Sequence, residues 1–307
     1  MSPLSTKIVV YQGEPGANSH IACTEVFPDW ETVNKPTFED AFAAVAEGAA
    51  DLAMIPIENT IAGRVADIHH LMPVSGLNIV GEFFLPLQHQ LMAVKGATLE
   101  TVKMAYSHPH ALAQCRIALK KLGLMPHAAA NTAGAARLIA EAQDPTKAAV
   151  ASSLAAKIYG LDIIAADIAD ADHNTTRFII LSREPDWAPS DNGPTVTTFV
   201  SKVPNVPAAL YKALGGFATN SVNMTKLESY QIEGECVATQ FYADVEGHPD
   251  DSNVRLALAE LGFFSAEVKI LGVYPAHPFR FAERKKQAAA AVLTQWRHDE
   301  RIAEVTP

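Results

Sequence analysis

The sequence predicts an α/β protein made of two parts with different topologies. Through about residue 180, short β-branched runs alternate with alanine-rich runs of helical character. The segment Glu184–Pro194 (EPDWAPSDNGP) then breaks all periodicity, and the pattern beyond it is β-α-β-β-α-β. A chain of 307 residues is long enough to form two hydrophobic cores. We therefore expect a first domain at 1–183, a linker at 184–194, a second domain at 195–276 and a helical tail at 277–307.

Strands that each lead into a capped helix make up the first domain. The sequence predicts strands at Lys7–Tyr11, Leu52–Ile57, Val102–Tyr106 and Ala148–Ala151. It predicts helices from about Asn18 to Phe27 with Asn18 or Ser19 as the cap, from Thr37 to about Gly48, and from caps at Ser107, Thr132 and Ser152. Because a βαβ connection joins parallel strands, we expect parallel sheets.

The second domain has the ferredoxin-like order of elements, which is typical of small ligand-sensing modules. The predicted elements are Thr195–Val200, Ala208–Phe217, Asn223–Ser229, Cys236–Val245, Asn253–Leu261 and Glu267–Val273. The alanine-rich tail at Phe281–Thr306 is expected to form a peripheral helix.

Charge and composition exclude several classes of protein. The formal net charge of −10 argues against nucleic acid as a partner, because phosphate binding needs a basic face. An anionic substrate would have to be held by a few local cations and helix N-termini. The three cysteines, Cys23, Cys115 and Cys236, are far apart and indicate a reducing compartment without a disulfide framework. No apolar run approaches the roughly 20 residues that cross a bilayer, so we expect a cytoplasmic protein without membrane contact.

Four polar stretches stand at the ends of predicted strands: three follow a strand, where the ligands of open parallel sheets collect, and the fourth leads into the buried strand at Ile179–Leu181. They are Gly13–Ser19, Pro56–Arg64, Ser107–His110 and Asp170–Phe178. Each can also be read as a plain turn: Thr176 is then simply a β-prone residue, and Arg177 pairs with Asp170 or Asp172. Arg64 is a candidate anion clamp or an ordinary surface arginine.

A metal site is not expected. His108 and His110 do not share a helix face, and neither cysteine nor carboxylate is spaced to complete a site with them and His89. From the residues alone, the sequence predicts a two-lobed binder of small anions with an appended sensing module.

Taken together and in order, the motifs resemble the prephenate dehydratase family over nearly the whole chain. They read YQGEPGANS, MIPIENTIAG, GEFFLPLQHQL, SHPHALAQC, NTAGAA, HNTTRF, NMTKLES and LGVYP. The resemblance implies decarboxylating dehydration of prephenate to phenylpyruvate in phenylalanine biosynthesis. It implies a catalytic domain folded like a type II periplasmic binding protein, followed by an ACT domain that senses phenylalanine. Neither a metal nor an organic cofactor is expected.

The resemblance also implies roles for individual residues. Thr176 would donate a hydrogen bond or relay a proton to the leaving hydroxyl, Arg177 would hold a substrate carboxylate, and Phe178 would form an apolar wall beside the ring. Glu58 would orient other groups, or would be protonated and share the acid role. Further neutral donors would come from Ser19, Asn59, Ser107 and Thr132.

The expected effector site departs from the family pattern. Relatives that bind phenylalanine usually have Gly-Ala-Leu where this chain has Ala208, Ala209 and Leu210, and Glu-Ser-Arg-Pro where it has Glu228, Ser229, Tyr230 and Gln231. Asn223 completes the candidate set. The Cβ of Ala208 and the loss of the arginine make phenylalanine a possible rather than a required effector. ACT modules usually pair their sheets, so we expect a homodimer or a homotetramer.

Two other functions fit the same motifs. One is arogenate dehydratase, which acts on the aminated analogue of the same ring. The other is a non-catalytic amino-acid sensor built on the same lobes, although such a sensor would not need Thr176, Arg177 and Phe178 together.

Overall fold

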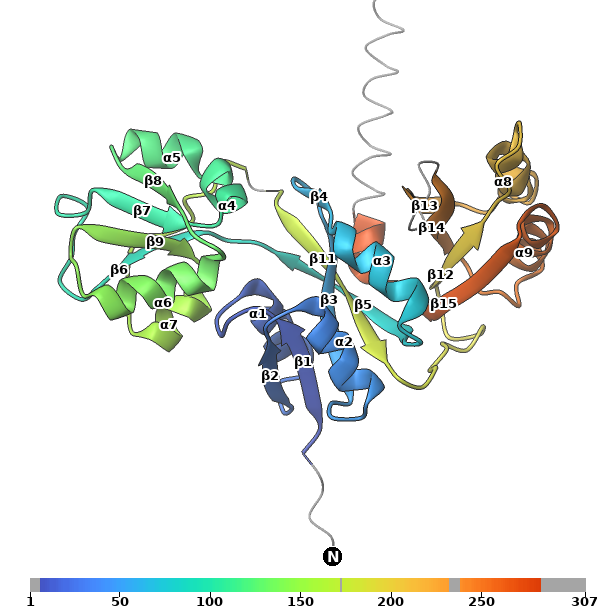
Figure 1. The fold of residues 1–307 in the computed structure, drawn as a ribbon, viewed down its shortest axis with the longest axis horizontal. Helices are drawn as coiled ribbons and strands as arrows, with labels where there is room; N and C mark the ends of the chain where they lie inside the picture. Colours follow the sequence, from blue (N-terminus) through green and yellow to red (C-terminus); the bar gives the residue numbers. More distant parts are fainter. Residues whose placement is uncertain (1–5, 172, 232–237, 283–307) are drawn as a thin grey trace, which may run out of the picture.

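In the computed structural model, three sheets lie side by side, with one lobe at each end and one in the middle (Figure 1). The structure describes residues 6–171, 173–231 and 238–282. No helix in these ranges is both long and apolar enough to cross a membrane.

The middle lobe, called lobe A here, has strand order β2-β1-β3-β11-β5, with β4 paired to β3. Helix α1 covers one face of this sheet, while α2 and α3 pack against the other. The elements are β1 (Ile8–Gln12), α1 (Asn18–Val26), β2 (Glu31–Lys35), α2 (Phe38–Ala46), β3 (Leu52–Asn59), β4 (Gly63–Arg64), α3 (Ala66–Val74), β5 (Asn78–Pro86) and β11 (Thr175–Ser182).

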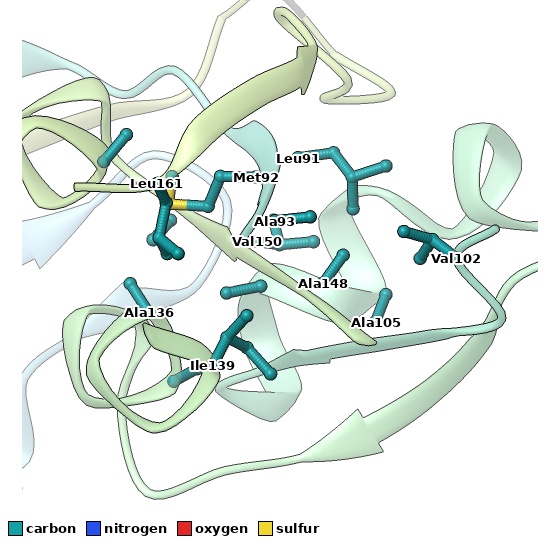
Figure 2. Packing of buried hydrophobic residues seen from close by; sticks show 14 of the residues in the cluster. Leu91, Met92, Ala93, Val102, Ala105, Ala136, Ile139, Ala148, Val150 and Leu161 are labelled. Carbon is teal, nitrogen blue, oxygen red and sulfur yellow. The ribbon is translucent and has the colours of Figure 1, made fainter. Parts of the chain in front are cut away.

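The second lobe, lobe B, has strand order β10-β6-β9-β7-β8 around a core rich in alanine (Figure 2). Short alanine side chains let its helices lie close to the sheet. The elements are β6 (Gln90–Ala93), β7 (Met104–Ser107), α4 (Pro109–Gln114), α5 (Arg116–Lys121), β8 (Met125–Ala128), α6 (Thr132–Ala142), β9 (Lys147–Ala151), α7 (Ser153–Tyr159) and β10 (Asp162–Ala165).

The expectation of parallel sheets is wrong for the strands at the crossings between the lobes. The chain passes from β5 into β6 and returns from β10 into β11, and each of these strands pairs antiparallel with its neighbours. Only the strands joined by helices within one lobe, such as β1 with β3 and β7 with β9, are parallel. The mixed sheets thus result from the double crossing that builds the two-lobed fold.

Two of the predicted helix caps are confirmed, and three are displaced. The hydroxyl of Thr37 accepts from the Asp40 amide, and that of Ser152 accepts from the Ala155 amide. Helix α1 instead begins after Ala17, without a side-chain cap, while His108 caps α4 and Asn131 caps α6. Ser107 stays in β7 because its backbone pairs with β8.

The C-terminal sheet has strand order β13-β14-β12-β15, as the ferredoxin-like pattern predicts. Its elements are β12 (Thr195–Lys202), α8 (Ala209–Thr219), β13 (Met224–Gln231), β14 (Ala238–Glu246), α9 (Ser252–Phe264) and β15 (Glu267–Pro275). Helices α8 and α9 share the core on one face of the sheet. Most of the expected helical tail lies outside the described residues.

The C-terminal domain has the place in the chain that the resemblance gives to an ACT domain, and it is called by that name here. The other face of its sheet packs directly on lobe A. One hydrophobic core combines Ile55 and Ile179 of lobe A with Val196, Tyr242 and Leu271 of the ACT domain. The intervening residues 184–194 form neither helix nor strand. The two domains nevertheless bury a common core, so the ACT domain is an integral layer of the molecule.

A single added methyl group tests this contact. A Cβ on Gly272 of β15 would lie 2.1 Å from the carbonyl oxygen of Ile79 in β5. We expect Gly272→Ala to lower the free energy of unfolding by about 3 kcal/mol, the upper end of overpacking costs. Gly262→Ala, in α9 with nothing within 4 Å of the new Cβ, should instead raise it by about 0.5–1 kcal/mol. Urea titration measures both, and equal stabilities would contradict the close approach.

Candidate active site

Two side chains predicted from the sequence meet at the edge of lobe A. Asn59 at the end of β3 and Thr176 at the start of β11 are cross-strand partners. The Asn59 amide Nδ2 donates to the Thr176 hydroxyl oxygen at 3.0 Å and to the Asn174 side-chain oxygen at 2.8 Å. Because Thr176 accepts from Asn59, its own hydroxyl proton points elsewhere and can be donated.

Three further side chains extend this contact into lobe B. Asn174 donates to the side-chain oxygen of Gln114 at 2.9 Å, and His89 lies 2.7 Å from the same oxygen. An oxygen only accepts, so His89 Nε2 carries the proton. Burial lowers the pKa of His89, which keeps the ring neutral at neutral pH. A polar chain of neutral groups therefore runs from Thr176 through both lobe crossings.

A pocket of about 430 Å³ borders this polar chain at Gln114 and Asn174. That volume is in the range of small-molecule sites. Its other lining residues are mostly apolar and are Ile61, Ala62, His110, Ala113, Ala169, Asp170 and Ala171. The pocket combines an apolar wall with a few convergent polar groups.

The turn after β1 joins the lobes. Glu14 pairs with Arg137 of α6 at 2.8 Å, and the carbonyl of Gly16 accepts the Ser152 hydroxyl at 2.6 Å. The carbonyl of Pro15 accepts the Tyr159 hydroxyl at 3.0 Å. The sequence predicted that this turn presents amides to an anion, whereas here it presents carbonyls and a carboxylate to lobe B.

Arg177 does not face the pocket. Side chains alternate along β11, so Thr176, Phe178 and Ile180 lie on the α1 face, and Arg177 lies with Ile179 on the face covered by the ACT domain. Its side chain is only 3% exposed. A cavity of about 140 Å³ beside it is smaller than typical ligand sites. The geometry therefore does not match the expected clamp on a substrate carboxylate.

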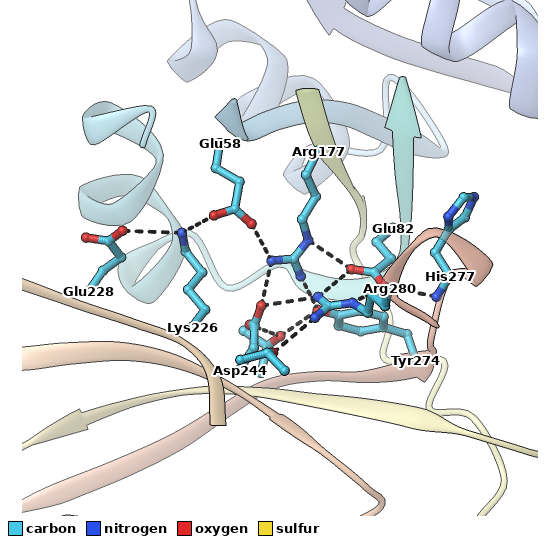
Figure 3. A network of polar contacts seen from close by, with 11 residues as sticks. Glu58, Glu82, Arg177, Lys226, Glu228, Asp244, Tyr274, His277 and Arg280 are labelled. Carbon is cyan, nitrogen blue, oxygen red and sulfur yellow. Dashed lines mark hydrogen bonds and ion pairs between the residues drawn. The ribbon is translucent and has the colours of Figure 1, made fainter. Parts of the chain in front are cut away.

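The donors of Arg177 are instead taken up by protein groups, as Figure 3 shows. Nε donates to Glu82, and Nη1 donates to Glu58 and to Asp244 of β14. Nη2 donates to the Tyr274 hydroxyl of β15 at 2.9 Å. Burial by itself lowers the pKa of Arg177, but these acidic neighbours raise it well above its ordinary value. Arg177 is thus a fixed cation between lobe A and the ACT domain.

The other candidates are spread over the molecule. Glu58 lies in the same ion network, where burial raises its pKa but Arg177 and Lys226 outweigh that effect and leave it below the ordinary value. A protonated Glu58 that shares the acid role is therefore not supported. Phe178 is 1% exposed within the core under α1, so it is not a cleft wall.

The remaining neutral donors do not join Thr176. Ser107 is buried in lobe B and donates to the Val150 carbonyl at 2.6 Å. Thr132 opens the first turn of α6, and Ser19 is 8% exposed in α1.

Sequence reasoning missed His89, Gln114 and Asn174, and on the ACT side Lys226 and Asp244. The first three stand inside the motifs GEFFLPLQHQL, SHPHALAQC and HNTTRF, so their place in quoted motifs was a usable signal. Lys226 likewise stands inside the quoted motif NMTKLES, whereas Asp244 lies in none of the motifs. Alternation in a half-exposed strand does not say which face another domain covers.

Comparisons with known proteins agree on one family. The family model described as Prephenate dehydratase matches residues 9–186, more than half of the chain. The chain belongs to the prephenate dehydratase family. A "Bifunctional N-acyl-homoserine lactone acylase/prephenate dehydratase" of Komagataeibacter europaeus is 50% identical over 274 residues, which are 89% of this chain and 98% of the relative. "Arogenate dehydratase 2" of Petunia hybrida is 39% identical, covering 87% of this chain and 71% of the relative.

A solved structure supports the same fold. The prephenate dehydratase of Arthrobacter aurescens, in complex with L-Phe, superimposes with a TM-score of 0.81 at 30% identity, covering 93% of this chain and 99% of the other. The fold class predicted from the sequence, two catalytic lobes followed by an ACT domain, is confirmed.

The expected effector residues do not all lie together within this chain. Asn223 donates to Glu246 at 3.0 Å, and Ala208 precedes α8 with Ala209 and Leu210. Glu228 and the Ser229 carbonyl both accept from Arg64 of β4. Arg64 is thus bound to the ACT domain rather than placed as an anion clamp, and the segment at Glu228–Ser229 contacts the catalytic lobe directly.

Ala208 adopts a left-handed conformation with φ of +60°, which glycine adopts without strain. We expect Ala208→Gly to raise the free energy of unfolding by about 1 kcal/mol, the cost of the left-handed region for an L-residue. Ala218→Gly, on the exposed side of the same helix α8, should lower it by about 1 kcal/mol. Opposite signs in chemical denaturation support the strained conformation, and equal losses would contradict it.

Proposed function

We propose that the protein catalyses the decarboxylating dehydration of prephenate to phenylpyruvate, carbon dioxide and water. The observation that carries this proposal is the Thr176 hydroxyl, which accepts from Asn59 and so keeps its own proton for another partner. The same Asn59 amide donates to Asn174, a residue that lines the pocket. The match of the family model to the catalytic lobes supports the same reaction.

The reaction needs orientation and one proton. The ring carboxylate leaves as carbon dioxide, the electron pair of that C–C bond enters the ring, and the ring C–O bond breaks. The departing hydroxide takes a proton and becomes water, while the ring becomes aromatic. Aromatisation supplies the driving force, so a hydroxyl held in place is a sufficient donor.

The substrate carboxylates are held by neutral groups in this proposal, since Arg177 is committed to the ACT interface. Glu14 pairs with Arg137 of α6 at 2.8 Å, which places the start of α6, with Thr132, near the junction of the lobes. Such a helix N-terminus favours an anion even in a chain with a net charge of −10. Ser19 is retained as a further donor at the α1 end.

Regulation and assembly belong to the same proposal. L-phenylalanine is proposed as the effector, supported by the Arthrobacter aurescens relative, whose structure was solved in complex with L-Phe. A homodimer or a homotetramer is proposed, supported by Tyr211 and Phe263, which are both 82% exposed on the ACT helices. A cytoplasmic location agrees with the free thiols of Cys23 and Cys115.

Two observations favour other substrates for the same pocket. Asp170 lies in its wall with its carboxylate accepting from the Ile117 and Ala118 amides, and the remaining negative charge would favour the ammonium group of arogenate over the keto group of prephenate. The Petunia hybrida relative is an arogenate dehydratase. The apolar side chains Ile61, Ala113 and Ala169 suit an acyl chain, and the Komagataeibacter europaeus relative is also an N-acyl-homoserine lactone acylase.

The role of Thr176 is tested by removing its hydroxyl without changing its shape. We expect Thr176→Val to lower kcat for prephenate about 10²–10⁴-fold, the usual contribution of a positioned proton donor. KM should change little, because the hydroxyl acts on the leaving group. Thr176→Ser, which keeps the hydroxyl, is the matched control and should retain most activity. A valine variant with normal kcat would remove Thr176 from the mechanism.

Substrate choice is tested by assaying prephenate, arogenate and an N-acyl-homoserine lactone side by side, with and without phenylalanine. We expect prephenate turnover to dominate. Asp170→Asn should lower the ratio of kcat/KM for arogenate to that for prephenate about tenfold, since a charge-assisted contact becomes a neutral one. Binding of prephenate without turnover of any of the three compounds would support the sensor function instead.

A further inference from the structure

Lys226 is one of the ACT side chains that contact the ends of β3 and β11, and it does so through Glu58. Lys226 lies on β13, its side chain is 6% exposed, and its Nζ donates to Glu58 of lobe A at 2.6 Å. The same Nζ lies 3.4 Å from Glu228. A buried ammonium that is bound to a carboxylate of another domain leaves a costly unpaired charge when either partner is removed.

Glu58 links Lys226 to Arg177, the residue next to Thr176, the proposed proton donor. Its second oxygen accepts from Arg177 at 2.8 Å, so one carboxylate bridges Lys226 and Arg177. Glu58 precedes Asn59, and Arg177 follows Thr176. In the ladder between β3 and β11, Glu58 pairs with Arg177 and Asn59 pairs with Thr176.

Two consecutive ladder steps therefore serve opposite faces of one sheet. The pair of Asn59 and Thr176 is joined by a hydrogen bond to Asn174, which lines the pocket, and the pair of Glu58 and Arg177 lies under the ACT domain. Backbone geometry couples adjacent residues of a strand, so a shift of Glu58 toward or away from Lys226 also moves Asn59. The register of β11 with β3 changes between Arg177 and Phe178, whereas its register with β5 stays regular from Thr175 to Ile180. A shift at this point therefore changes the β3 side of the ladder.

From this geometry we infer that Lys226 is a positioning residue for the reaction, acting through Glu58 on the hydrogen bond between Asn59 and Thr176. The inference rests on the proposed function and assigns the ACT domain a part in turnover itself. Lys226 touches neither the pocket nor the reacting atoms in this arrangement.

The same lysine lies at the segment that carries the expected effector residues. Glu228, two residues along β13, contacts both Lys226 and Arg64, and Arg64 also binds the Ser229 carbonyl. A displacement of this segment would act on Glu58 through Lys226 and on the end of β4 through Arg64. Both routes lead to the turn of lobe A that follows Asn59.

The experiment uses the full chain and a double-mutant cycle of Lys226→Met and Glu58→Gln. We expect Lys226→Met to lower kcat about 10–100-fold with KM within about threefold, because a small misplacement of reacting groups costs that much. Lys212→Met, on the exposed surface of α8, is the matched control and should turn over like wild type. All rates are measured below the unfolding midpoint of each variant.

The double-mutant cycle distinguishes a role of Lys226 in positioning Glu58 from a role in stability alone. If Lys226 acts through Glu58, the double variant should lose no more kcat than the worse single variant. The double variant also removes both charges together, so it keeps the test valid where Lys226→Met alone fails to fold. Normal kcat in the folded lysine variant, or losses that multiply in the double variant, would overturn the inference. Absence of turnover in wild type itself, with prephenate and with arogenate, would instead overturn the proposed function.

Discussion

The two-residue period of strand β11 is the constraint on which the arrangement of the molecule depends. Adjacent residues of a strand point to opposite faces, so Thr176 and Arg177 cannot both serve the pocket. Thr176 meets Asn59 at the lobe junction, and Arg177 enters the ion network under the ACT domain. One short motif therefore supplies the proposed proton donor and the attachment of the second domain.

That attachment balances the charges it buries. Each buried carboxylate or guanidinium costs several kcal/mol in lost hydration, and the cost is offset only when partners are close and numerous. Glu82 and Asp244 are fully buried, and both accept from Arg177 and Arg280. Burial raises the pKa of Asp244, but Arg177 and Arg280 outweigh this and keep it below the ordinary value. The network therefore favours one relative placement of the two domains, which a purely apolar contact would fix less strictly.

The sequence predicts the order of helices and strands well, but it does not predict which face of a sheet another domain or helix covers. Strand and helix order, the caps Thr37 and Ser152 and the ferredoxin-like topology follow from local propensity and turn chemistry, which act within a few residues. The roles expected for Arg177 and Phe178 do not match the structure, because they depend on which face of lobe A each domain or helix covers. Asn59 and Thr176, both candidates from the sequence, lie together because they stand at the ends of two paired strands that the motifs mark.

Because Thr176, the proposed proton donor, is adjacent to Arg177, which binds the ACT domain, a change in the ACT domain can act on the reaction. An effector need not enter the pocket to act, because the β13 segment is already joined to Glu58 by Lys226 and to β4 by Arg64. A ligand changes an equilibrium only by its differential affinity for two states, so it must favour one position of this segment over another. Ala208 stores strain at the start of α8, on the opposite side of the ACT sheet from lobe A. The changed effector motif can therefore alter which ligand is sensed while the charged connection to the catalytic lobe is kept.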